Sequence, residues 1–126
     1  MVPASAIRWL AVAGAVLIAA IAADSLVPVA WQIRTGLHWL TEHFLAYFTV
    51  TLVFCLALQR PAIVAGGLMA FAVSLEALQG LTADRVPDLP TAFCGAAGVM
   101  AGALLAPLLI GLFKRRKAVQ PEALGR

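Results

Sequence analysis

The run SLEALQGLTADRVPDLPTAFCGAAGVMAG at residues 74–102 interrupts an otherwise apolar chain with polar and charged side chains. Glu76 and Gln79 end one apolar segment, and Asp88 stands just before the next. Because both neighbouring segments are long enough to cross a bilayer, the run marks a turn between two membrane-spanning helices. We therefore expect a functional site to be built around this turn.

The composition is that of a small integral membrane protein. Of its 126 residues, 63% are hydrophobic and 12% are charged, and the mean hydropathy is +0.96. A soluble domain of this size would need more polar residues to cover its surface. Four segments approach the roughly 20 residues that a membrane span requires, at residues 7–27, 41–58, 62–80 and 89–113.

These segments predict an all-α fold, a bundle of four transmembrane helices. The transmembrane domain is expected over residues 1–113, followed by a basic cytoplasmic tail over residues 114–126. A mixed stretch at residues 29–39 holds two Trp among polar residues, which is typical of the membrane–water boundary. We interpret this stretch as an interfacial connector. Pro107 predicts a kink or a local relaxation in the fourth helix.

The first segment also resembles a signal peptide. Arg8 precedes its apolar core, and Ala20-Ile21-Ala22 has the small residues of a cleavage site. The apolar stretch is long for such a peptide, and only one basic residue precedes it. We therefore favour a retained first span.

The charge distribution predicts the topology. The basic block KRRK at residues 114–117 follows the last apolar segment, and such blocks stay on the cytoplasmic side. Four spans then place both termini in the cytoplasm of a multi-pass plasma-membrane protein, with the first and third connectors outside. The block also suits contact with anionic lipid. Nucleic-acid binding is not expected, because no folded basic domain accompanies the block.

No cofactor or metal site is expected. The two cysteines, Cys55 and Cys94, lie within apolar segments, where free cysteine behaves as a small hydrophobe. Neither is part of a pair or a His/Cys pattern with metal-ligand spacing.

The candidate ligand-binding or structural polar cluster consists of six residues: His43, Tyr47, Glu76, Gln79, Arg85 and Asp88. His43 and Tyr47 are four residues apart, and Glu76 and Gln79 three, so each pair shares a helix face. An ionised carboxylate near hydrocarbon is costly and needs a partner. Arg85, nine residues after Glu76, is the natural one.

Structural and functional interpretations of this cluster both remain open. Glu76 and Arg85 could form a clasp between two helices, bind a ligand, or supply an acid–base group. Asp88 is a helix N-cap candidate that could also line a pocket. His43 could carry protons or serve as a hydrogen-bonded interfacial histidine.

Gly95, Gly98 and Gly102 recur at nearly one-turn intervals in the last segment. Small residues at this spacing allow a second helix to approach closely. We favour packing within the chain over packing between two copies, and the spacing does not give the oligomeric state.

In their order these residues resemble the VanZ-like family of small membrane proteins. The resemblance covers residues 43–102 and rests on HFLAYF at 43–48, EALQ at 76–79, and the later Arg, Asp and Gly residues. The chain departs from the family pattern in two places. Trp39 and Leu40 stand where the family often has Asp-Lys, and Ala92 stands where it often has Asn.

The resemblance implies a role in the cell envelope with a link to glycopeptide (teicoplanin) resistance, and it supplies no reaction. We expect binding of an anionic envelope lipid or a lipid-linked cell-wall precursor at the outer face, with Arg85 holding the anion. One alternative is a membrane-embedded enzyme that acts on such a lipid, with Glu76 or His43 as its acid–base group. A small proton-coupled exporter is the less favoured alternative.

Overall fold

The computed structural model describes residues 3–82, 86 and 88–119. Within this part the chain contains no strand and forms four long helices: α1 (Ala4–Leu26), α2 (Trp39–Leu58), α3 (Pro61–Gln79) and α4 (Leu89–Val119). Each helix is long and apolar enough to cross a membrane. The prediction of an all-α, four-span bundle is therefore confirmed.

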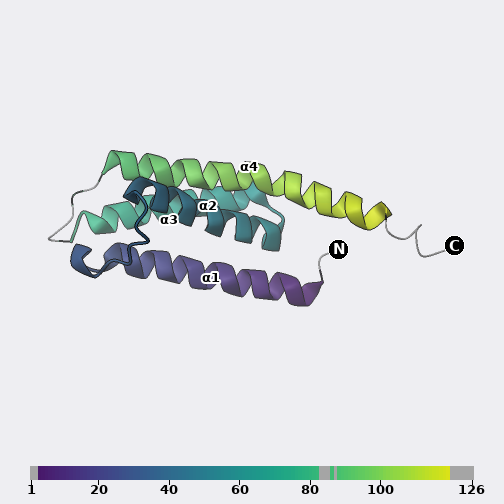
Figure 1. The fold of residues 1–126 in the computed structure, drawn as a ribbon, viewed down its shortest axis with the longest axis horizontal. Helices are drawn as coiled ribbons and strands as arrows, with labels where there is room; N and C mark the ends of the chain where they lie inside the picture. The colour runs from purple at the N-terminus through teal and green to yellow at the C-terminus, as the bar shows by residue number, and fades with distance from the viewer. Residues whose placement is uncertain (1–2, 83–85, 87, 120–126) are drawn as a thin grey trace.

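The helices alternate in direction, so that the end of α1, the start of α2, the end of α3 and the start of α4 lie towards one end of the bundle, here named the connector end (Figure 1). The start of α1, the α2–α3 turn and the end of α4 lie towards the opposite end. Helix α2 packs against all three other helices, and most closely against α4. The buried core joins α2, α3 and α4 through Tyr47, Val50, Cys55, Val64, Leu68, Val99 and Ala106.

The α2–α3 turn is short because two of its residues favour a reversal of the chain direction. Gln59 takes a left-handed conformation (φ 54°), and its N–H donates to the Cys55 carbonyl, which ends α2. Pro61 then opens α3, at a position where its missing N–H costs little.

The structure adds detail to the extent of the helices. Helix α4 continues to Val119, past the predicted end of the last span at residue 113, so the basic block at residues 114–117 is helical. Pro107 lies inside this helix. The connector at residues 29–39 is helical only in one 3₁₀ turn, η1 (Val29–Trp31), before α2 begins at Trp39.

The glycines of α4 lie against α2, within the same chain. A Cβ at Gly98 would collide with the Phe44 carbonyl oxygen, and a Cβ at Gly102 would lie 2.8 Å from the Phe48 carbonyl oxygen. At Gly95 an added Cβ would meet the Tyr47 ring at 3.2 Å. The two backbones thus approach to a distance that side chains would prevent.

Replacing Gly98 with Leu should destabilise the bundle by about 1–3 kcal/mol or more, because the backbone of α2 cannot give way as a side chain can. Ala97→Leu is the matched control, since Ala97 is exposed on the same helix. Thermal unfolding in detergent compares the two variants. Equal losses of stability would show that the close contact with α2 has no special weight.

Candidate functional site

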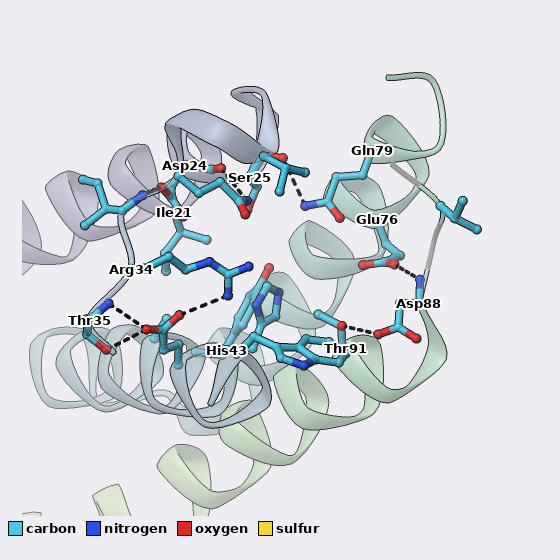
Figure 2. A pocket seen from close by; sticks show the side chains of 18 residues that line it. Ile21, Asp24, Ser25, Arg34, Thr35, His43, Glu76, Gln79, Asp88 and Thr91 are labelled. Atoms are coloured by element: carbon cyan, nitrogen blue, oxygen red, sulfur yellow. Dashed lines mark hydrogen bonds and ion pairs between the residues drawn. The ribbon is translucent and has the colours of Figure 1, made fainter. Parts of the chain in front are cut away.

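The connector end of the bundle encloses a cavity of about 450 Å³, here named the polar chamber (Figure 2). Its walls come from the end of α1, the first connector, the start of α2, the end of α3 and the start of α4. The polar lining consists of Asp24, Ser25, Gln32, Arg34, Thr35, Glu42, His43, Tyr47, Glu76, Gln79, Asp88 and Thr91.

The first connector is fixed across the chamber by two carboxylates. Asp24 Oδ1 accepts a hydrogen bond from the Ile33 N–H at 2.8 Å. Glu42 Oε1 accepts from the Thr35 N–H at 2.8 Å and from the Thr35 hydroxyl at 2.6 Å. Gly36, with φ +88°, then lets the chain turn into α2. Side chains of α1 and α2 therefore hold the connector backbone in place.

Arg34 brings a positive charge to the chamber from this fixed connector. Its Nη1 lies 3.7 Å from Glu42 Oε2, and its side chain is 52% exposed. The guanidinium points towards the chamber interior (Figure 2). An ion pair this long and this exposed is weak. A guanidinium has five N–H donors, so one contact leaves donors that a ligand can use.

A second pair of carboxylates joins the end of α3 to the start of α4. Glu76 Oε1 accepts from the Asp88 N–H at 2.8 Å, and Asp88 Oδ2 accepts from the Thr91 hydroxyl at 2.8 Å. The Asp88 carbonyl accepts from the Ala92 N–H, so Asp88 occupies the N-cap position of α4. The turn is thus anchored by groups that also line the chamber.

Gln79 connects the end of α3 with the end of α1. Its side chain is buried, and Nε2 donates to the Ser25 carbonyl at 3.2 Å. This bond uses one of the carbonyls that a helix end leaves without an intrahelical partner. Glu76 and Gln79 share the chamber-facing side of α3, as their spacing predicted.

His43 and Tyr47 project from α2 into the same space. Their ring centroids are 5.7 Å apart, and Tyr47 is only 3% exposed. His43 lies between Arg34 and the Thr91 end of the chamber (Figure 2). The chamber therefore presents an imidazole, a phenol and a guanidinium beside its carboxylates.

The chamber brings together five of the six candidate residues from the sequence: His43, Tyr47, Glu76, Gln79 and Asp88. The sixth, Arg85, lies outside the described residues, and so does its expected clasp with Glu76.

Asp24 and Arg34 also line the chamber, although neither was among the candidate residues and the first connector was expected to serve as a membrane anchor. The available signal was a pair of charged residues ten positions apart, with Asp24 near the end of the first predicted span and Arg34 in the connector that follows. Such charges need polar partners. Within the described part of the chain, no three His, Cys, Asp or Glu side chains are grouped to hold a metal ion.

Comparison of the chain with protein-family models, curated proteins and solved structures found no match. The resemblance to the VanZ-like family therefore stays a prediction from the order of motifs. The site is interpreted from its own geometry and chemistry.

Replacing Glu42 with Ala should speed hydrogen exchange at the Thr35 amide, because that N–H loses its acceptor and the connector can open locally. Thr41→Ala is the control, since Thr41 is exposed in the same first turn of α2. Exchange measured by mass spectrometry on a peptide covering residues 32–38 reports the effect. Equal exchange rates in the two variants would mean that other contacts hold the connector.

Proposed function

We propose that this chain is a VanZ-like protein of the cell envelope that binds an anionic, hydroxyl-bearing lipid headgroup in the polar chamber. The observation that supports the proposal is a guanidinium and several hydrogen-bonding groups facing one cavity at the end of four apolar helices. An anionic lipid headgroup carries a phosphate that can pair with the guanidinium and hydroxyls that can pair with the other polar groups, and it lies at the ends of membrane-spanning helices.

The depth of the chamber suits a headgroup. Trp31, in the first connector, is 79% exposed, and Trp39 lines the chamber where α2 begins. Trp is enriched at the membrane–water interface, where one end of the ring is apolar and the other wet. These two Trp support a chamber at the depth where the phosphates and the glycerol or sugar groups of a bilayer are found.

Arg34 is the described group best suited to hold a phosphate. The planar guanidinium can donate two parallel hydrogen bonds to phosphate oxygens. His43, on the neighbouring wall, is placed to contact the same anion. In this proposal Arg34 takes the role that the sequence analysis gave to Arg85.

The four carboxylates of the chamber restrict the kinds of ligand that it can bind. Asp24, Glu42, Glu76 and Asp88 all line the chamber, and ionised carboxylates only accept hydrogen bonds. A bare phosphate would meet repulsion from them, whereas hydroxyl groups would donate to them. We therefore expect phosphate next to hydroxyls, as in phosphatidylglycerol or a glycosylated polyprenyl phosphate of cell-wall synthesis. By the same resemblance, we propose that occupancy of this site affects glycopeptide tolerance.

The excess of carboxylates also favours a second candidate function, the proton-coupled export of organic cations. A carboxylate at membrane depth can bind a proton or a cationic substrate. Each of the four carboxylates already accepts a hydrogen bond from the protein, which gives them a structural role. An enzyme acting on the lipid would use His43 or Glu76 as its acid–base group.

The lipid proposal predicts tighter binding of phosphatidylglycerol and of glycosylated polyprenyl phosphate than of phosphatidylcholine. Arg34→Gln should weaken binding of both anionic lipids about ten- to a hundredfold, since a charge-assisted hydrogen bond is worth about 1.5–3 kcal/mol. Arg60→Gln is the control, because Arg60 is exposed at the opposite end of the bundle. Native mass spectrometry in detergent measures the affinities.

Three outcomes decide between the candidates. Equal affinity for phosphatidylglycerol and phosphatidylcholine would overturn the lipid proposal. Equal losses of lipid affinity in the Arg34 and Arg60 variants would mean that the overall surface charge, and not the chamber, determines binding. Binding of tetraphenylphosphonium without binding of either anionic lipid would select the exporter.

We also propose that the chamber faces outwards, because the basic block at residues 114–117 favours a cytoplasmic end for α4. In a background with Cys55 and Cys94 replaced, a cysteine at the exposed Leu37 should react with a membrane-impermeant maleimide in intact cells. Arg60→Cys should react only after permeabilisation. The reverse pattern would invert the topology.

A further inference from the structure

A second cavity, of about 390 Å³, lies beside the polar chamber between α3 and α4 and is here named the lateral groove. Its apolar walls are Met69, Ala72, Val73 and Ala77 of α3 and Ala92 and Ala96 of α4. Most of these side chains are small, which leaves a hollow between the two helices.

The lateral groove opens on the side of the bundle. Val73 is 69% exposed, and Ala77 and Ala92 are exposed with it. These residues belong to helices that are long and apolar enough to cross the membrane. In a bilayer the opening therefore faces lipid.

The groove extends along most of one leaflet. Its residues on α3 run from Met69 to Ala77, and eight residues of α-helix rise about 12 Å. Half of the roughly 30 Å hydrocarbon core of a bilayer is about 15 Å. The groove thus reaches from beside the chamber most of the way towards the middle of the membrane.

The two cavities are neighbours that share four lining side chains, those of His43, Tyr47, Glu76 and Thr91. The chamber side of this junction is polar, and the groove side is apolar. Such a junction suits a molecule with a polar end and an apolar end, joined at this level.

We propose that the lateral groove holds one hydrocarbon chain of the lipid whose headgroup binds in the polar chamber, and that the lipid arrives sideways between α3 and α4. The inference rests on the proposed function and adds the place of the chain and the route of the ligand. The choice of occupant rests on the four side chains that line both the groove and the chamber. A protein helix lying in the groove would leave the charged chamber unexplained.

The test uses phosphatidylglycerol with a diazirine midway along one acyl chain, and the full-length protein in phosphatidylcholine nanodiscs. After illumination, labelled residues should map to the groove walls on α3 and α4. Excess unlabelled phosphatidylglycerol should suppress this labelling, while labelling of the exposed α1 residues Val12 and Val16 persists. A polyprenyl phosphate with a diazirine in its chain forms the second arm and distinguishes the two lipid sources.

A matched pair of variants separates the groove from the rest of the surface. Ala96→Phe fills the groove, whereas Ala97→Phe places the same ring at an exposed neighbouring position. Only Ala96→Phe should abolish the competed labelling, and it should weaken phosphatidylglycerol binding about tenfold. The chain-free headgroup, glycerophosphoglycerol, should bind both variants equally. If Ala96→Phe fails to fold, Ala92→Phe at the exposed rim makes the same comparison.

The outcomes distinguish this inference from the proposed function. If phosphatidylglycerol binding depends on Arg34 but Ala96→Phe and Ala97→Phe behave alike, the groove proposal is wrong and the headgroup proposal stands. Labelling spread evenly over all lipid-facing helices would also overturn the groove proposal alone. A groove that stays unlabelled in a protein that native mass spectrometry shows to be a dimer would assign the groove to a contact between two copies of the chain. Binding of neither lipid to the wild-type protein would overturn both proposals.

Discussion

The close approach of α4 to α2 at Gly98 is the contact on which the rest of the structure depends. It brings the two backbones together where a single Cβ would not fit. The same glycine face, one turn earlier at Gly95, lies against the rings of Tyr47 and His43. Packing that fixes the bundle therefore also fixes two side chains, Tyr47 and His43, that line the polar chamber. A loss of this contact would disturb the fold and the site together.

The polar side chains at the connector end supply hydrogen-bond partners to backbone groups that lack them. Helix ends and connectors have backbone groups without intrahelical partners, and hydrocarbon offers none. Here the carboxylates of Asp24, Glu42 and Glu76 accept from connector and turn N–H groups, and Gln79 donates to a carbonyl at the end of α1. The interactions that close this end of the bundle also hold the chamber walls in place.

The sequence predicted the features that follow from periodicity and span length. The four apolar segments predicted the four-helix bundle. The spacing of Glu76 and Gln79 predicted that both lie on one side of α3. The path of the first connector could not be predicted in the same way. It depends on side-chain contacts such as Thr35 with Glu42 and Ile33 with Asp24, which neither hydropathy nor helical periodicity encodes. Hydropathy predicted residue 113 as the end of the last apolar segment. It could not predict the end of the helix, because the basic residues that follow are good helix formers.

The central claim is that the polar chamber and the lateral groove together form one site for an amphipathic lipid. The most direct test is an experimental structure of the protein in nanodiscs containing phosphatidylglycerol. The claim predicts phosphate density beside Arg34 and continuous chain density passing His43 and Thr91 into the groove between Val73 and Ala92. A headgroup bound outside the chamber, or a groove filled by a second copy of the chain, would contradict it.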